Sequence, residues 1–269
     1  MSTATLNPVR IFLDLWRHRY LLGQLIKRDV LLRYRGAMFG VLWIFLSPLI
    51  MLVVFAFVFG QIFQARWPQQ DGTTPFWLLL YASLIAFNVF AESVSRAPAS
   101  VRGYPSFVKK IVFPLHILPI VPLGTALVHA AFNFLILLAV LGWTGNLHGR
   151  MVLFPFLILP VFLLTLGLSW FMAAWGVFIK DMTQIVPIFI QVLMFLSPVF
   201  YPVSAAPEVL KPLYRYNPLG TVIESSRALV TGQPIEWSAW GMALVCAAAV
   251  MALGHAFFQY SRDEFADVL

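Results

Sequence analysis

The side chains of this chain that could take part in acid–base or metal chemistry are five histidines, 11 acidic residues and one cysteine. The sequence contains no GxxxxGK[ST] phosphate loop, no HExxH and no GxSxG motif, and Cys246 lacks the cysteine partners of a metal site. The histidines are scattered over unrelated segments and are interpreted as structural: His18, His116, His129, His148 and His255. The sequence therefore predicts no catalytic, cofactor-binding or metal-binding residue.

One pair of polar residues has a spacing that matters. His129 and Asn133 are one helical turn apart within a long uncharged segment, so a helix there would present both side chains on the same face. An imidazole and an amide on one face of an apolar helix could line a polar path. The nature of the barrier that such a path would cross depends on the helices that contain His129 and Asn133.

Those elements are predicted to be membrane-spanning helices. Of the 269 residues, 61% are hydrophobic and only 11% are charged, with a mean hydropathy of +0.85, whereas soluble domains have roughly 25% charged residues. Residues 37–63 include no charged side chain and exceed the roughly 20 helical residues that cross a bilayer. Within this run, Ser47-Pro48 is predicted to kink the helix rather than to end it.

Six apolar runs are predicted to span the membrane, at about 37–63, 75–91, 111–143, 151–179, 184–203 and 237–260. In the third, Pro114, Pro119 and Pro122 predict a broken start, with a regular helix from about Leu123. An even number of spans places both termini on one side, and most of the 18 Lys and Arg residues fall there, so that side is predicted to be cytoplasmic. The net charge of +7 is then a topological signal, and no nucleic-acid partner is expected.

With these spans, none of the acidic residues falls in mid-bilayer. Seven are assigned to cytoplasmic positions, Asp14, Asp29, Glu92, Asp181, Asp263, Glu264 and Asp267, and the remainder to the outside, Asp71, Glu208, Glu224 and Glu236. Because ion-coupled transport normally needs an ionisable group within the membrane, a proton-driven antiporter is disfavoured. Any uphill transport would need an energy source on another polypeptide.

Two segments are neither spans nor simple loops. Residues 7–28 begin with Asn7-Pro8, a cap and first-turn pair, and their apolar and charged side chains gather on opposite faces except at Arg19, which predicts a helix lying in the cytoplasmic interface. Residues 218–231 form a second amphipathic segment, with Asn217 as its cap and Gly232 as its end. At about 21 Å it is too short to span, so it is interpreted as re-entrant, with a surface helix as the alternative.

Four segments together resemble a known family: residues 26–49, 106–123, 195–232 and 261–269 are similar to the membrane subunits of ABC-2 type exporters of O-antigen, capsule or teichoic-acid polymers. The resemblance covers nearly the whole chain in order. It implies an all-α integral membrane fold of six transmembrane helices, with an N-terminal amphipathic interface helix and two short re-entrant periplasmic helices between spans 5 and 6. The implied organisation is an interfacial segment 1–36, a transmembrane domain 37–260 and a cytoplasmic tail 261–269.

The resemblance also implies partners and a location. Two copies would form a homodimeric channel in a bacterial cytoplasmic membrane, and two copies of a nucleotide-binding ATPase subunit would hold ATP and Mg²⁺, so this chain itself would need no cofactor. The substrate would be a lipid-linked polysaccharide. A cytoplasmic coupling loop 92–110 would contact the ATPase through Arg96, Arg102, Lys109 and Lys110. The lipid head group would gain access at Arg33 and Arg35, and the loop 204–232 would close the periplasmic exit through Tyr214, Asn217, Pro218, Glu224 and Arg227.

A sugar polymer needs a path that holds water and offers flat apolar faces to its rings. From the aromatic and polar residues of the spans, the predicted pathway set is Trp43, Tyr81, Phe87, Asn88, His129, Asn133, Trp170, Trp175 and Tyr201. Two other classes of function remain open at this stage. One is a membrane-embedded glycan-modifying transferase, with Glu92, His116, Asp181 and Glu224 as its candidate acids and bases, and the other is a passive scaffold.

Overall fold

The computed structural model describes residues 8–64, 74–108, 113–203, 207, 214 and 217–268, and these residues form helices and turns without a strand. Five helical segments are long and apolar enough to cross a membrane: Gly40–Ile62, Phe76–Arg102, Leu115–Trp143, Gly149–Phe178 and Trp237–Val268. A sixth apolar helix, Met182–Leu196, is shorter. The chain is an all-helical multi-pass membrane protein, as its composition predicted.

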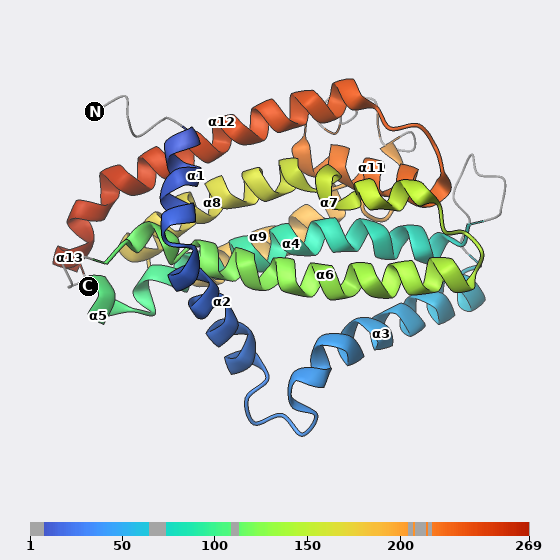
Figure 1. Ribbon diagram of the computed structural model, residues 1–269, viewed down its shortest axis with the longest axis horizontal. Coiled ribbons are helices and arrows are strands. Elements are labelled where there is room, and N and C mark those ends of the chain that lie inside the picture. Colours follow the sequence, from blue (N-terminus) through green and yellow to red (C-terminus); the bar gives the residue numbers. More distant parts are fainter. Residues whose placement is uncertain are drawn as a thin grey trace.

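Four long helices lie side by side along the long axis of the molecule (Figure 1). They are α4 (Phe76–Arg102), α6 (Ile120–Trp143), α8 (Leu159–Phe178) and α12 (Trp237–Ser261). Helix α4 is the most buried of the spans, because α6, α8, α9 (Met182–Leu196) and α11 (Pro218–Thr231) all pack against it. Helix α4 is therefore the element from which a side chain can reach the inside of the bundle.

Close helix contacts in this bundle depend on glycine. A Cβ on Gly254 of α12 would lie 2.0 Å from the carbonyl oxygen of Gly167 of α8, and a Cβ on Gly176 would lie 2.2 Å from the carbonyl oxygen of Pro98 of α4. Both neighbours are backbone atoms, which cannot move aside as a flexible side chain can. Small residues let membrane helices approach closely enough for dispersion contacts to hold them together.

The first span is set apart from this bundle. Helix α3 (Trp43–Phe55) contains Pro48 without ending there, as predicted, and continues into the π-helical turns of η3 (Ala56–Ile62). Figure 1 shows it diverging from the other long helices. Only 11% of this span is buried, and side chains such as Val53 and Phe57 are more than half exposed. This apolar surface requires lipid or another protein surface as its neighbour.

The N-terminal segment forms two helices rather than the single predicted one. Helix α1 (Pro8–Arg17) ends at Arg17, His18 forms a turn, and α2 (Arg19–Arg33) begins at Arg19, the residue that breaks the amphipathic pattern. Helix α1 crosses the bundle near one end, where α5 (Pro105–Val108), α13 (Phe265–Val268) and the C-terminus also lie (Figure 1). Helix α2 then leads toward α3.

Two helix ends reflect local sequence. The proline-rich stretch before α6 forms a short 3-10 turn, η4 (Leu115–Ile117), and the regular helix begins at Ile120, slightly before the predicted Leu123. Helix α9 ends at Leu196, short of the predicted 184–203, because Ser197 is extended ahead of Pro198. The remaining short elements are η2 (Gly40–Leu42), η5 (Gly149–Leu153), α7 (Phe154–Leu157) and η7 (Arg262–Glu264).

Helix α11 matches its prediction closely at both ends. The Asn217 side chain accepts a hydrogen bond from the Leu219 backbone N–H at 3.0 Å, Pro218 is the first helical residue, and Gly232 ends the helix with a φ of 73°. Between α9 and α12, α11 is the one helix whose bounds lie within the described residues, and Tyr214 is also helical. Two short re-entrant helices were predicted in the loop 204–232; of residues 204–216 the structure describes only positions 207 and 214.

Candidate functional site

A cavity of about 830 Å³ lies between α3, α4 and α6, beside the C-terminal end of α2. It brings together residues that the sequence analysis selected for different reasons: Arg33, Trp43, Tyr81, Asn88, Arg96, His129 and Asn133. Asn88 is exposed to this cavity, although Phe87 and Val89 beside it on α4 are only 2% and 1% exposed. An apolar bundle thus contains a polar hollow at the level of its central helix.

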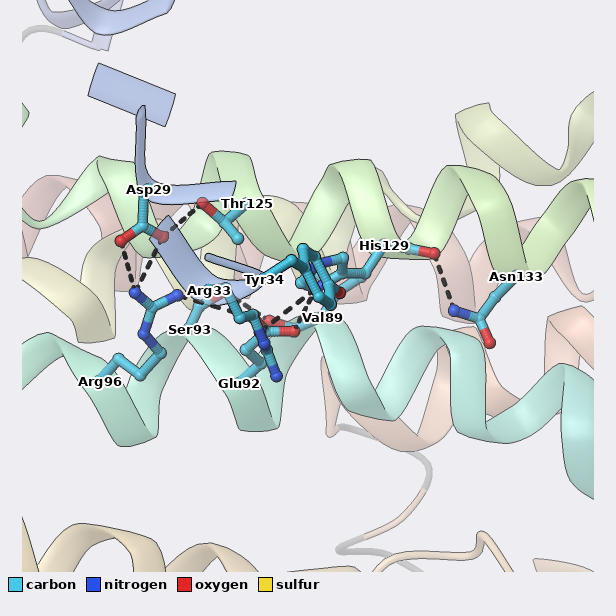
Figure 2. A network of polar contacts seen from close by, with 10 residues as sticks. All are labelled: Asp29, Arg33, Tyr34, Val89, Glu92, Ser93, Arg96, Thr125, His129 and Asn133. Atoms are coloured by element: carbon cyan, nitrogen blue, oxygen red, sulfur yellow. Dashed lines mark hydrogen bonds and ion pairs between the residues drawn. The ribbon is translucent and has the colours of Figure 1, made fainter. Parts of the chain in front are cut away.

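Glu92 of α4 is the centre of a polar network at this cavity (Figure 2). Its Oε1 accepts a hydrogen bond from Nη1 of Arg33, and its Oε2 lies 2.9 Å from Nδ1 of His129. The Tyr34 hydroxyl lies 3.1 Å from Nε2 of the same imidazole. Because both ring nitrogens have partners, the orientation of the His129 ring is fixed. The side chains of Glu92 and His129 are 17% and 14% exposed, so the carboxylate needs these partners.

A second ionic group links α2 to the same two helices. Both carboxylate oxygens of Asp29 accept hydrogen bonds from Nη2 of Arg96, at 2.7 and 2.8 Å, and Thr125 of α6 donates to Oδ2 at 2.7 Å. Burial raises the pKa of Asp29, but the bonds from Arg96 and Thr125 outweigh burial, so the pKa is lower than usual. Asp29 is therefore ionised at neutral pH, and it ties the interfacial helix to the bundle (Figure 2).

The polar path predicted from His129 and Asn133 continues beyond the charged group. Nδ2 of Asn133 donates to the carbonyl oxygen of His129 at 2.8 Å, and the Tyr81 hydroxyl donates to Oδ1 of Asn133 at 2.9 Å. These residues, which come from α4 and α6, all line the cavity. The cavity wall therefore combines a paired ionic end with neutral hydrogen-bonding groups and the aromatic faces of Trp43 and Tyr81.

A smaller groove of about 480 Å³ lies beside the cavity, between α2 and the start of the first span. Its basic lining residues are Lys27, Arg28 and Arg35, and its lining includes no acidic residue. Arg33 and Arg35 were predicted together at the lipid head-group site, but the structure separates them. Arg33 pairs with Glu92 in the cavity, whereas Arg35 is exposed in the groove with the two other basic side chains.

Four predicted pathway residues lie away from the cavity, and one of them, Tyr201, lies instead beside Tyr214. Phe87 and Trp170 are buried at 2% and 0% exposure inside the bundle, where the Trp170 indole N–H donates to the carbonyl oxygen of His116 at 2.8 Å. Trp175 is 40% exposed on the outside of α8 and packs on Phe171. Because the bundle helices are apolar on all sides, nothing in their pattern distinguishes aromatic side chains that pack in the core from those that face a cavity.

The segment around α11 has its own ionic centre. In the amphipathic pattern of residues 218–231, Arg227 lies opposite the apolar stripe, but its side chain is only 4% exposed. Its Nε donates to Ser83 Oγ of α4 at 2.7 Å, its Nη2 donates to the carbonyl oxygens of Pro198 and Val199, and its Nη1 contacts Glu224 at 3.0 Å. Burial lowers the pKa of Arg227 to about 10, against the opposing effect of Glu224. Through its hydrogen bonds to these carbonyl oxygens, the Arg227 guanidinium fixes the position of the backbone that follows α9 relative to α11.

Two tyrosines complete this region. The hydroxyls of Tyr201 and Tyr214 are 2.9 Å apart, and Tyr201 also donates to the carbonyl oxygen of Phe195. Burial and the contact with Tyr214 raise the pKa of Tyr201 to about 12. Tyr201 was predicted for the pathway and Tyr214 for the exit loop, and the structure joins the two.

The predicted coupling segment 92–110 is partly helical. Helix α4 continues to Arg102, so residues 92–102 are helical rather than a loop, and α5 follows directly. The second span was predicted to end at residue 91 because charged side chains begin at Glu92. In the structure these charges pair with α2 and α6, and the apolar face of α4 continues through Val94, Ala97 and Val101. Lys109 and Lys110 lie outside the described residues.

Comparison with known proteins shows the family of this chain. The family model described as ABC-2 type transporter matches residues 20–231, most of the chain. The chain belongs to the ABC-2 type transporter family. This match includes α2, the cavity, the basic groove and α11, which are the features described above.

Individual relatives of this ABC-2 transporter chain are similar to it over most of their lengths. It is 26% identical to the O-antigen export system permease protein RfbA of Myxococcus xanthus, over 96% of this chain and 99% of that protein. It is 23% identical to a Klebsiella pneumoniae protein of the same description, over 93% and 95% of the two chains. It is 26% identical to the polysialic acid transport protein KpsM of Escherichia coli, over 77% and 79%.

Proposed function

We propose that this chain is the transmembrane subunit of an ATP-driven exporter that moves a lipid-linked polysaccharide, of the O-antigen or capsular type, across a bacterial cytoplasmic membrane. The observation that carries this proposal is the match to an O-antigen export permease over 99% of that protein's length. Because ATP binding and hydrolysis would be the work of separate nucleotide-binding subunits holding ATP and Mg²⁺, the chain would contribute the path.

The chemistry of the cavity supports a polymer path. Charges at its wall are paired with one another, Arg33 with Glu92 and Arg96 with Asp29. They leave little net field to hold a polymer in place. Neutral groups such as Asn88 and Asn133, together with Tyr81, offer exchangeable hydrogen bonds to sugar hydroxyls. A sliding substrate needs many weak contacts, since tight binding at one point would stall it.

The same cavity supports a homodimer. Ser47 and Asn88 are exposed polar side chains on membrane-spanning helices, and polar groups are costly against lipid. A second copy facing α3 and α4 would enclose these groups in a water-filled path. It would also cover part of the exposed apolar surface of α3.

The basic groove is the best site for the anionic head group of the lipid carrier. Lys27, Arg28 and Arg35 lie at one groove without an acidic partner among its lining residues. A diphosphate would gain charge-assisted hydrogen bonds from the two guanidinium groups. Arg33, which pairs with Glu92, would instead link the groove to the cavity.

The other predicted roles follow from position. Arg102 and α5, which lie at the end of the molecule that contains α1 and α13 (Figure 1), would form the contact with the ATPase on the cytoplasmic side. Arg96 is engaged with Asp29 and would transmit motion rather than dock. Helix α11 with Tyr201, Tyr214 and Glu224 would form the periplasmic gate.

The test is co-expression of this chain with its cognate ATPase in a strain that lacks its own permease, followed by detection of the polysaccharide at the cell surface. Export is expected with both subunits and absent when either is omitted. Replacing Lys27, Arg28 and Arg35 together with glutamine should reduce export while the protein level stays constant. A matched triple replacement of exposed cations outside the groove, Arg17, Arg150 and Lys180, should leave export unchanged.

Two outcomes would contradict the proposal. Surface polysaccharide that is unaffected by loss of this chain would indicate a passive scaffold. Surface polysaccharide that arrives in normal amount but with altered sugar linkages or substituents would indicate a glycan-modifying transferase, for which Glu92 and His129 would be the acid–base pair.

A further inference from the structure

A cluster of three potential metal ligands lies outside the cavity, at the other end of the interfacial segment. Asp14 belongs to α1, His18 lies at the break between α1 and α2, and His116 belongs to the turn η4 that precedes α6. One ligand atom of each residue lies within 4.8 Å of those of the other two. Residues that are far apart in the sequence thus bring two imidazoles and a carboxylate to one point.

His116 is the buried member of the cluster. Its side chain is 7% exposed, and its Nε2 lies 2.7 Å from Oδ2 of Asp14 without the alignment of a hydrogen bond. A lone pair on that nitrogen would face the negative carboxylate, which is unfavourable unless a cation lies between the two groups. The backbone of His116 is held in place because its carbonyl oxygen accepts a hydrogen bond from Trp170.

His18 is oriented in the way that metal-binding histidines usually are. Its Nδ1 lies 2.9 Å from the backbone carbonyl oxygen of Asp14, and in this arrangement Nδ1–H donates and Nε2 keeps its lone pair. The side chains of Asp14 and His18 are 45% and 28% exposed, which leaves a route for an ion from solvent. Arg262 brings a positive charge to this end of the molecule, but its guanidinium contacts Asp263 and Gln259.

The donor set selects a class of ion. Two imidazoles and one carboxylate suit zinc and similar divalent transition metals rather than calcium or magnesium, which prefer oxygen ligands. Zinc bonds of about 2.1 Å in tetrahedral geometry place ligand atoms about 3.4 Å apart. Rotation of the half-exposed Asp14 side chain and a small shift of His18 would bring the three atoms to that spacing.

We propose that Asp14, His18 and His116 form a binding site for a divalent transition metal of the zinc type, which fastens the N-terminal helix α1 to the start of α6. This differs from the interpretation of the histidines as purely structural that their scattered positions in the sequence favoured. It is independent of the transported substrate. Ile11 is buried and Leu15 packs against the same core cluster, so a metal bridge would add a second kind of attachment to this apolar one.

The test uses the full chain without a polyhistidine tag, purified in detergent and stripped of metal with EDTA. Zinc is added in increments against a competing fluorescent chelator, and bound metal is counted by elemental analysis after desalting. We expect one zinc per chain, and a rise in the thermal unfolding temperature on adding zinc. His116→Ala and His18→Ala should each abolish saturable binding and this rise, whereas His148→Ala, which removes an exposed histidine elsewhere, should abolish neither.

Because His116 is buried, its replacement could prevent folding, and His18→Ala and Asp14→Asn provide partly exposed alternatives. Each variant is used only if it elutes as the wild type does in size-exclusion chromatography. Wild-type protein that binds no zinc would overturn the proposal and would leave a proton as the cation between His116 and Asp14. One equivalent of zinc retained in both His18→Ala and Asp14→Asn would equally overturn it.

Discussion

Replacement of Arg227 by methionine should destabilise the protein more than any exposed charge replacement. The guanidinium is 4% exposed and donates to Ser83 and to the carbonyl oxygens of Pro198 and Val199. Methionine fills a similar volume but donates no hydrogen bond, so these buried acceptors would lose their partner. Glu224 would lose its ion pair, but it is 39% exposed and can be solvated instead.

These contributions give an expected magnitude. On the Glu224 side, loss of the ion pair costs less than about 1 kcal/mol, because that carboxylate is 39% exposed and water can solvate it. Removing one partner of a buried ionic group costs about 3 to 5 kcal/mol, mostly because the remaining polar groups stay buried without partners. We therefore expect Arg227→Met to lower the free energy of unfolding by about 4 kcal/mol. Arg227→Lys should lie between wild type and Arg227→Met, because an ammonium keeps the charge but lacks the planar fork that reaches several acceptors.

The assay is equilibrium unfolding in mixed micelles, followed by tryptophan fluorescence, with the same measurement on Arg150→Gln as control. Arg150 is exposed and makes only a 3.4 Å contact to the Gly232 carbonyl oxygen, so its replacement should change stability little. If Arg227→Met stays within about 1 kcal/mol of wild type, the carbonyl groups after α9 do not depend on the guanidinium and the reasoning fails.

Three further predictions concern the bundle and its polar network. The pKa of Asp29 is lowered in the folded protein, so its contribution to stability is complete above the ordinary pKa of about 3.9 and is lost as the pH falls through the lowered value. Asp29→Asn should therefore flatten the dependence of the unfolding temperature on pH in that acidic range. An unchanged slope would contradict the assignment. Gly167→Val should prevent folding, because a Cβ at this position would lie 2.5 Å from a carbonyl oxygen of α12. Gly241→Ala should fold normally, because the space around Gly241 is open. Equal yields of folded monodisperse protein for the two variants would refute the packing argument. In a double-mutant cycle of Glu92→Gln and His129→Gln, the two losses of unfolding free energy should be non-additive by about 1 to 2 kcal/mol, and strict additivity would show that the 2.9 Å contact does not couple them.

Several features were predictable because they depend on local chemistry. The residues that begin and end α11 are Asn217-Pro218 and Gly232. Their backbone conformations depend only on contacts with residues close by in the sequence. The break of the N-terminal helix was not predicted, although it lies beside Arg19, the residue that interrupts the amphipathic pattern. The choice of His129 and Asn133 needed only the helical repeat. In each case the determining contacts are within about four residues along the chain.

Other features were not predictable, because their partners are distant in the sequence. In the sequence, Glu92 indicates the start of a polar loop. In the structure it pairs with Arg33 of α2 and His129 of α6, and α4 continues past it because the carboxylate is neutralised by these partners. Arg227 reads as an exposed residue of an amphipathic helix, yet acceptors on α4 and after α9 bury it. One signal could have predicted that α4 continues past Glu92. In residues 92–102 the charged side chains alternate with apolar ones that stay on one face of a helix.

The sequence by itself determined that this chain crosses a membrane several times as helices, because the hydrophobic free energy of an apolar run and the backbone's need for internal hydrogen bonds leave no other solution in lipid. Only the tertiary structure decided which polar groups meet: that Glu92 and Asp29 are paired with bases from other helices, that Arg35 remains in a basic groove, and that Asp14 meets His116. These contacts depend on how the helices pack against one another. A helix that is apolar on every side has no sequence pattern that indicates which helices will be its neighbours.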